Sequence, residues 1–190
     1  MGSKFENKFL GTFGDLGIYS LTPHKIITTG QGGMVVTADR RIAQKLRSIK
    51  DHGRCSKGTG GNDIHKELGF NFKMTNLQAA VGLGQLSDID KRVGQLQQTY
   101  RLYHKKLSGC KNVNLMNFSL KTGELPLWVD IIAENREKLH QMFIAKGVHP
   151  RLYWHPIHTQ KPYQTSGADF PISSSLCRRA MWLPSNLRIK

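Results

Sequence analysis

The sequence predicts an α/β protein, because segments with the pattern of strands and segments with the pattern of amphipathic helices alternate along its 190 residues. Short β-branched segments bounded by turn residues occur at 16–21 and 34–37. In the helical segments, apolar residues recur every three or four positions. The pattern changes after the longest helical segment, which predicts two domains, residues 1–110 and residues 111–190.

A turn-rich stretch, 22–33, separates the first two predicted strands. Asp39 follows the second strand and can accept hydrogen bonds from the free amides of a helix predicted over 40–50. Residues 53–69 are glycine-rich and polar and lack apolar periodicity, which predicts a long loop. The order strand, turn, strand, helix and loop is typical of part of an α/β domain.

The next segment predicts one long helix, from Thr75 to about Leu107. Thr75 and Gln78 have the spacing of a capping box at its start. Large side chains then follow at spacings of three and four, which places them on one stripe of the helix. They are Leu86, Ile89, Val93, Leu96, Tyr100, Tyr103 and Leu107. Ser108 and Gly109 are expected to end the helix.

The last part of the chain predicts three strands and two helices. The strands lie at 113–116, 125–132 and 148–154, the last interrupted by Pro150, and the helices at 134–146 and 173–182. No run of about 18 apolar residues occurs, so no membrane-spanning segment is expected.

The formal charge of +15, with 28 Lys and Arg against 13 Asp and Glu, favours an anionic partner. Nucleic acid is one candidate, and a phosphorylated cofactor with a nucleotide-diphosphate substrate is another. The basic residues are spread along the chain in single positions and short doublets, whereas a nucleic-acid arm is more often a concentrated run. We therefore expect no nucleic-acid partner, and keep a basic nucleic-acid-binding module as the alternative from another class.

Three scattered cysteines, Cys55, Cys110 and Cys177, form no CxxC pair and indicate a reducing, cytoplasmic setting. His155 and His158 have two residues between them, which raises the alternative of a metal site. Because no third ligand lies nearby in the sequence, packing or hydrogen bonding is the more typical role, and no metal is expected.

The segment 19–33 has the pattern of a cofactor site. It places Lys25 in a tight connection, where a lysine amine can be held near an aldehyde. The Ser20 hydroxyl and backbone amides could hold a phosphate, and the glycines of 30–33 allow close approach of the backbone. On composition alone, a lysine beside a glycine-rich turn is more often a solvated surface residue.

Four blocks of this sequence resemble the DegT/DnrJ/EryC1/StrS family of sugar aminotransferases, which depend on pyridoxal 5'-phosphate (PLP). They are 14–36 around Lys25, 69–86, 153–158 and Leu183-Pro184. Gln31 and Lys73 depart from this pattern, since the family usually has glutamate and arginine there. The blocks 70–76 and 153–158 look most like members that act on GDP-4-keto-6-deoxymannose, the perosamine synthases.

The resemblance implies a fold-type I, aspartate aminotransferase-like architecture, with the remainder of the large PLP-binding domain followed by a small α/β C-terminal domain. Lys25 matches the lysine that binds the cofactor and moves the proton during catalysis. Ser20 matches the serine on the PLP phosphate, and Asn71 an asparagine that reaches the cofactor phosphate of the neighbouring subunit, which implies a homodimer with shared sites. Tyr153 and His158 fall at the sugar site.

The implied reaction moves an amino group, from glutamate, to a keto sugar linked to a nucleotide diphosphate. A pyridoxamine phosphate-dependent sugar 3-dehydratase is the alternative within the family. That branch has histidine in place of the lysine, so Lys25 favours transamination, although His24 lies beside it.

Family members are considerably longer than this chain, and their segments that bind the phosphate, stack on the pyridine ring and protonate its nitrogen have no match here. We therefore expect the chain to be a fragment that catalyses poorly alone and leaves strand edges and apolar faces uncovered.

Overall fold

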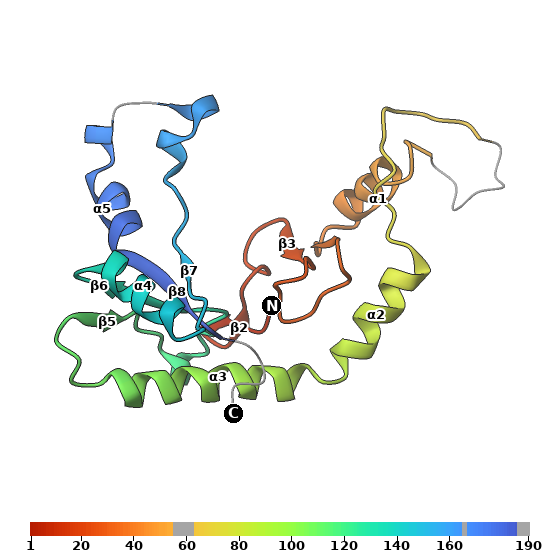
Figure 1. Ribbon diagram of the computed structural model, residues 1–190. Coiled ribbons are helices and arrows are strands. Elements are labelled where there is room, and N and C mark those ends of the chain that lie inside the picture. The colour runs from red at the N-terminus through yellow and green to blue at the C-terminus, as the bar shows by residue number, and fades with distance from the viewer. Residues whose placement is uncertain (55–62, 165–166, 186–190) are drawn as a thin grey trace. The chain divides into compact units, whose positions relative to one another are not determined.

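The computed structural model describes residues 1–54, 63–164 and 167–185. The chain forms two compact units, Met1–Lys91 and Arg92–Lys190 (Figure 1). The helix α3, Ile89–Leu107, carries the chain from the first unit into the second. The domain boundary expected near residue 110 follows the end of this helix and stays a prediction. Both units mix helices and strands, which confirms the predicted fold class.

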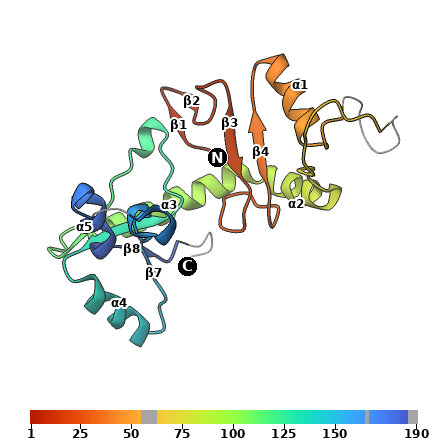
Figure 2. The same ribbon diagram turned by 90° about the horizontal axis from the view of Figure 1, so that it is seen from above.

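The described part of the first unit contains two antiparallel strand pairs. The hairpin of β1, Lys4–Phe5, and β2, Lys8–Phe9, turns through two residues with positive φ, as a tight two-residue hairpin requires. The strands β3, Gly17–Ser20, and β4, Gly33–Val36, pair so that Ser20 lies opposite Gly33, and Figure 2 shows them side by side. This pair confirms the two strands predicted in this region.

The helix α1, Arg40–Ile49, begins where the sequence predicts, because its N-terminus is capped as expected. The Asp39 carboxylate accepts from the amides of Arg41, at 2.7 Å, and Ile42, at 3.3 Å. Of the loop predicted over 53–69, residues 55–62 lie outside the described residues. Arg54 and His65 form a bridge across the described flanks of this segment.

The predicted capping box is present at the start of α2, Asn76–Leu86. The Thr75 hydroxyl accepts from the Gln78 amide at 3.2 Å, and the Gln78 side chain accepts from the Thr75 amide at 3.0 Å. The prediction of a single helix from Thr75 to Leu107 is wrong, because residues 87–88 interrupt the helical backbone between α2 and α3.

Local hydrogen bonds explain the break between α2 and α3. The Ser87 hydroxyl donates to the Gly84 carbonyl at 3.2 Å, and the Asp88 amide donates to the Gln85 carbonyl at 3.2 Å in a tighter turn. A serine side chain competes with helical hydrogen bonding in this way, and the glycines near the end of α2 lower its helix propensity. The apolar stripe continues across the break, which is why periodicity alone does not reveal it.

The second unit is built on a four-stranded antiparallel sheet of order β5-β6-β8-β7. Its strands are β5 Val113–Leu115, β6 Val129–Ala133, β8 Ala180–Leu183 and β7 Arg151–Leu152. The helices α4, Arg136–Ala145, and α5, Pro171–Arg179, join α3 around it. Four short 3₁₀ turns lie at Leu120–Thr122, Ile157–Thr159, Lys161–Tyr163 and Gly167–Asp169.

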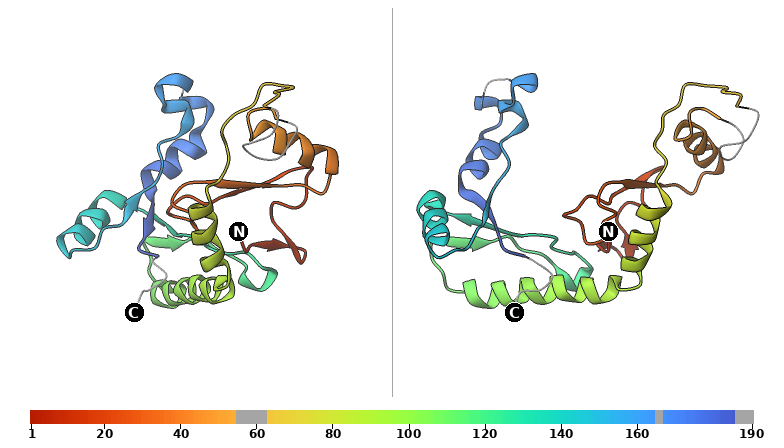
Figure 3. Two further views of the ribbon diagram at one scale, coloured as in Figure 1. Left: turned by 90° about the vertical axis from the view of Figure 1, so that its right-hand side faces the viewer. Right: turned by 45° about the vertical axis from the view of Figure 1, so that its right-hand side comes forward.

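Three predicted elements of this unit need correction. The helix predicted over 173–182 ends at Arg179, and the chain continues directly into β8, a central strand with every residue buried (Figure 3). The strand predicted over 125–132 begins only at Val129, after the buried Pro126, which has no amide hydrogen for a ladder. The strand predicted over 148–154 shrinks to Arg151–Leu152 for the same reason, since Pro150 precedes it.

The core of the second unit lies on one face of its sheet. Val129 and Ile131 of β6 meet Met181 and Leu183 of β8, all at most 5% exposed. Half-buried side chains from α3, α4 and β5 pack around this cluster: Tyr103, Leu107, Val113, Leu115, Leu139 and Phe143. In the part of the chain that the structure describes, no helix has the length and apolar character needed to cross a membrane.

Candidate functional site

Lys25 lies in a closed turn between β3 and β4. Its amide donates to the Thr22 carbonyl at 3.0 Å. The base of the turn closes on Leu21, whose carbonyl accepts from the Thr29 amide at 3.0 Å and whose amide donates to the Gly32 carbonyl at 2.9 Å. The backbone around Lys25 is therefore held by hydrogen bonds on both sides.

Buried apolar side chains anchor this turn. Leu21, Ile26 and Ile27 are each less than 5% exposed, whereas Lys25 is half-buried. Burial and, to a lesser extent, the positive charge of Lys25 lower the pKa of the Met1 amino group below its ordinary value, which places Lys25 in the same electrostatic environment. The buried isoleucines that follow Lys25 hold its backbone in place.

Ser20 ends β3 beside this turn, as the sequence predicts. Its hydroxyl lies 3.2 Å from the Thr22 hydroxyl, and the Thr22 carbonyl accepts from the Lys25 amide. The structure thus brings Ser20 and Lys25 together through Thr22, a residue that had no predicted role. The exposed hydroxyl pair could hydrogen-bond an anionic oxygen near the lysine.

Glycines shape the second half of the turn. Gly30 and Gly32 have φ of 78° and 146°, which side-chain-bearing residues rarely adopt. A Cβ atom at Gly32 would lie 2.8 Å from the Thr29 hydroxyl, which itself donates to the Gln31 carbonyl at 2.8 Å. The glycine requirement that the sequence indicates is therefore real at these two positions.

The helix α2 supports the turn with one face. Gln85 and Gln78 hydrogen-bond to the turn backbone, at Thr28 and at the Gln31 carbonyl respectively. Between them, Gly82 approaches so closely that a Cβ atom there would lie 3.0 Å from the Thr29 methyl carbon. Sequence reasoning missed these contacts, although the spacings of four and three from Gln78 to Gly82 to Gln85 place the three residues on one helix face.

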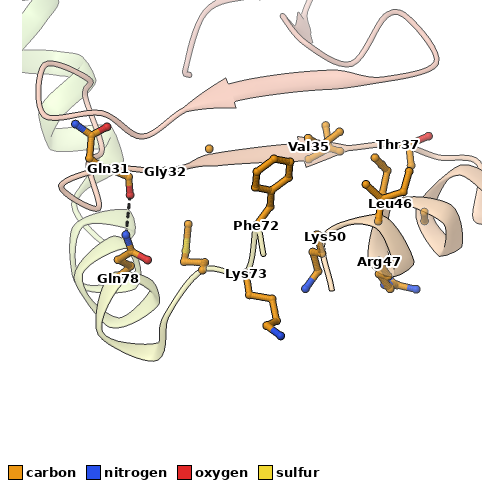
Figure 4. A pocket seen from close by; sticks show the side chains of 15 residues that line it. Gln31, Gly32, Val35, Thr37, Leu46, Arg47, Lys50, Phe72, Lys73 and Gln78 are labelled. Atoms are coloured by element: carbon orange, nitrogen blue, oxygen red, sulfur yellow. Dashed lines mark hydrogen bonds between the residues drawn. The ribbon is translucent and has the colours of Figure 1, made fainter. Parts of the chain in front are cut away.

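A hollow of about 850 Å³ lies between β4, α1 and residues 72–78. Figure 4 shows the ring of Phe72 directed toward β4, whereas the amines of Lys73 and Lys50 point away from that strand. Its wall is largely apolar, with basic side chains at one side. The hollow borders the glycine half of the turn of Lys25, because Gln31 and Gly32 also line it.

Asn71 lies on a separate segment that pairs with the end of α1. It is exposed and forms an isolated antiparallel bridge with Asp51. The Asp51 carboxylate, in a residue only 8% exposed, lies 2.5 Å from the Lys73 amine and 3.4 Å from the Arg54 guanidinium. The Lys73 hydrogen bond, with both positive charges, holds the pKa of Asp51 below its ordinary range despite burial. The predicted role of Asn71 on a phosphate stays a prediction.

Tyr153 and His158 lie in the second unit, close to α5. The ring of His158, 7% exposed, stacks on Phe170 at 4.7 Å, and its Nε2 lies 3.1 Å from the Ser174 hydroxyl. Tyr153 and Phe170 both line a hollow of about 520 Å³. The structure therefore places Tyr153 on the wall of this hollow and His158 behind Phe170, and their role at a sugar stays a prediction.

A metal role for His155 and His158 has no support among the described residues, where no group of three or more His, Cys, Asp or Glu could hold a metal ion. His158 instead makes the packing and hydrogen-bonding contacts that a buried histidine normally makes. Of the three cysteines, Cys110 is exposed and Cys177 is half-buried, both as free thiols, and Cys55 lies outside the described residues.

Comparison with known proteins identifies relatives of this chain. GDP-perosamine synthase of Escherichia coli O157:H7 is 32% identical over 188 residues, which cover 97% of this chain and 50% of the relative. GDP-perosamine synthase of Caulobacter vibrioides is 30% identical over 175 residues, or 89% of this chain and 46% of the relative. The chain spans about half the length of the curated relatives it matches.

Solved structures agree with these matches. A DegT DnrJ EryC1 StrS aminotransferase from Brucella abortus superposes on the whole chain with a TM-score of 0.87 and 28% identity, and the match covers 50% of that protein. This confirms the predicted architecture, part of a PLP-dependent sugar aminotransferase fold. The family itself matches residues 1–190, and the chain therefore belongs to the DegT/DnrJ/EryC1/StrS aminotransferase family.

Proposed function

We propose that this chain supplies the cofactor lysine of a PLP-dependent aminotransferase that transfers an amino group, from glutamate, to a keto sugar linked to a nucleoside diphosphate. The observation that carries the proposal is the position of Lys25 in a hydrogen-bonded turn, next to the Ser20 and Thr22 hydroxyls. Relatives named GDP-perosamine synthase favour a GDP-linked sugar, GDP-4-keto-6-deoxymannose, as the substrate.

The residues of the turn fit PLP. The cofactor needs an amine for its aldehyde and hydrogen-bond donors for its phosphate, and Lys25 and the Ser20–Thr22 hydroxyl pair offer both within one turn. Gly30 leaves open space beside them, since a Cβ atom there would meet no described heavy atom within 4 Å. The surplus of positive charge favours an anionic cofactor and an anionic substrate alike.

When bound, PLP supplies an electron sink for the carbon that loses its proton. In this proposal Lys25 would hold the cofactor at its aldehyde, and its amine, once released, would move the proton at the α-carbon of the amino donor. Ser20 would bind the phosphate with its hydroxyl, which lies beside that of Thr22. The buried residues Ile26 and Ile27 keep the lysine backbone from drifting.

We assign the remaining predicted residues to the substrate and to the partner subunit. Tyr153 would contact the sugar from the second unit, where it lines a hollow, whereas His158, buried behind Phe170, would act on the sugar site through that ring. Asn71 would reach the cofactor phosphate of a second copy in a homodimer with shared sites; its exposure on the surface of the first unit leaves it accessible for that role. The reducing, cytoplasmic setting expected from the cysteines stays a prediction.

The sugar 3-dehydratase alternative has one point in its favour. A GDP-4-keto-6-deoxy-D-mannose-3-dehydratase from E. coli with bound hydrated PLP shares the fold, with a TM-score of 0.84 at 19% identity. Fold likeness at this identity does not distinguish the two reactions. Lys25 at the cofactor position favours transamination, because a lysine amine can bind the PLP aldehyde.

The test is to capture PLP on the purified chain. The chain is mixed with PLP, its visible spectrum is recorded, the mixture is reduced with borohydride, and the modified lysine is mapped by mass spectrometry. We expect label on Lys25, loss of this label in Lys25→Ala, and no change in Lys50→Ala, which removes an exposed lysine of the same unit. Label spread evenly over surface lysines, in this chain and in any longer form of the protein, would contradict the proposal.

A further inference from the structure

One side chain of α2 satisfies both backbone groups of a residue in the Lys25 turn. The Gln85 amide nitrogen donates to the Thr28 carbonyl at 2.7 Å, and the Gln85 side-chain oxygen accepts from the Thr28 amide at 3.3 Å. A primary amide that pairs with a peptide in this way imitates a neighbouring strand. The two residues are 57 positions apart in the sequence, so this is a tertiary contact.

Thr28 is the point at which several parts of the turn meet. Its hydroxyl donates to the Leu21 carbonyl at 3.0 Å, the same carbonyl that closes the base of the turn. The same hydroxyl accepts from the Gly30 amide at 3.0 Å, which ties Thr28 to the glycine half. A contact that holds Thr28 in place therefore also restrains Leu21 and Gly30, which lie on either side of Lys25 in the turn.

Gln85 is itself held in place. Its amide nitrogen also donates to the Val81 carbonyl at 3.0 Å, one helical turn earlier, and its side chain is half-buried. At the other end of α2, the capping box fixes the first turn, and Gln78 donates to the Gln31 carbonyl at 3.1 Å. These hydrogen bonds hold α2 against the turn at both ends. Thr28, the residue that Gln85 contacts, is closer in sequence to Lys25 than Gln31, the residue that Gln78 contacts.

We propose that Gln85 is a positioning residue that holds the Lys25 turn in the conformation that presents the lysine amine to the cofactor. This inference rests on the proposed function, because it assigns Gln85 a role through Lys25 and gives it no contact with substrate or PLP. Its physical basis is the cost of leaving the Thr28 peptide without partners in a half-buried turn. Without Gln85, the Thr28 peptide would lose both partners in the closed turn, so the turn would sample other conformations in which water can reach that peptide.

The test compares variants that remove one or both of these hydrogen bonds. Gln85→Leu removes both, whereas Gln85→Glu keeps an acceptor for the Thr28 amide and loses the donor to the Thr28 carbonyl. Gln98→Leu is the matched control, since Gln98 is an exposed glutamine of α3. PLP affinity is measured from the visible spectrum, and labelling of Lys25 is compared with labelling of the exposed Lys50 after borohydride reduction.

We expect both Gln85 variants to weaken PLP binding, Gln85→Leu by about tenfold or more. The preference of the label for Lys25 over Lys50 should fall in parallel, and Gln98→Leu should match the unmodified chain. A purely structural role would lower the urea midpoint but leave the affinity and the label preference of the folded variant unchanged. That result would overturn the inference.

A measurement on the unmodified chain covers the case in which Gln85→Leu does not fold. The Thr28 amide should exchange its hydrogen slowly, and rapid exchange there would contradict the bridge. The two proposals fail in different ways. If the unmodified chain shows no specific Lys25 label, the proposed function fails and the inference fails with it. If the label is specific and both Gln85 variants retain it at full affinity, only the inference fails.

Discussion

The two units of this protein bury their apolar residues in different ways. In the second unit, four side chains from two paired strands form a closed cluster on one face of a sheet, with half-buried residues packed around it. In the first unit, the buried apolar side chains among the described residues are Leu21, Ile26 and Ile27. All three belong to the turn that carries Lys25, so burial in this unit is concentrated at the candidate site.

Large apolar side chains elsewhere in the first unit are exposed. Ile18, Met34 and Val35 on the β3–β4 pair are 76%, 47% and 47% exposed, in agreement with the uncovered strand faces expected from the sequence. Ile18 and Val35 are paired across the two strands, and adjacent exposed apolar side chains of this kind mark a place where a protein makes further contacts. The comparison teaches that the second unit is stabilised by its own core, whereas the order of the first unit depends on its backbone hydrogen bonds and on the anchored turn.

The largest effect expected from this difference comes from a matched pair of methionines. Met181 is fully buried in the core cluster, and Met34 on β4 is 47% exposed. Met181→Ala should lower the free energy of unfolding by about 3 kcal/mol, because it removes transfer energy and leaves a cavity. Met34→Ala should change it by less than about 0.5 kcal/mol.

Urea unfolding followed by circular dichroism measures both values. Equal losses in the two variants would show that the first unit buries Met34 as completely as the second buries Met181, and the comparison between the units would then be wrong.

The next largest effect on stability is expected where two backbone segments of the first unit lie close together. A Cβ atom at Gly17 would lie 1.7 Å from the Gly11 carbonyl oxygen, so Gly17→Ala must move one of the two segments. We expect a loss of about 1–3 kcal/mol. Gly94→Ala in α3 is the control, since its Cβ would meet no described atom within 4 Å and alanine raises helix propensity by about 1 kcal/mol.

Thermal unfolding of the two glycine variants gives the answer. A lower melting temperature for Gly17→Ala and a higher one for Gly94→Ala are expected. A neutral Gly17→Ala would mean that the close approach of residues 11 and 17 contributes nothing to the stability of the first unit.

Capping residues in the sequence predict correctly where two of the helices begin. Asp39 and the pair Thr75 and Gln78 mark the first residues of α1 and α2 correctly, because capping hydrogen bonds join neighbours in the chain. The strand β8 is different. Its apolar residues follow a helix directly, and only pairing with β6 and β7 makes them a strand, which no local pattern could show.

The candidate site divides in the same way. Ser20 and Lys25 lie within one turn, and their proximity follows from the chain itself. The resemblance to a family supplies their roles, whereas the bridge from Gln85 to Thr28 joins distant segments and becomes visible only in the structure. Periodicity places Gln78, Gly82 and Gln85 on one helix face, but nothing in the sequence states which segment that face meets.

The smallest effect concerns two carboxylates, one in each unit, whose pKa values shift in opposite directions. The ordinary pKa is 3.8 for both. The pKa of Asp51 is lowered, chiefly by its hydrogen bond with Lys73, so its ionised form stabilises the folded first unit. The pKa of Asp130 is raised by burial, and its Oδ1 has no hydrogen-bond partner, so its ionised form destabilises the folded second unit.

Replacing each aspartate by asparagine should therefore change stability with opposite signs. Asp51→Asn should destabilise the chain at neutral pH, and this loss should persist down to the ordinary pKa of 3.8 and vanish only below it, as the pH falls through the lowered pKa. Asp130→Asn should stabilise the chain at neutral pH, and this gain should fade earlier, as the pH falls through the raised pKa toward 3.8. Urea midpoints of both variants between neutral pH and pH 4 measure these trends. A constant gain for Asp130→Asn over that range would show that burial does not raise its pKa, and the expected opposite shifts of the two carboxylates would then be wrong.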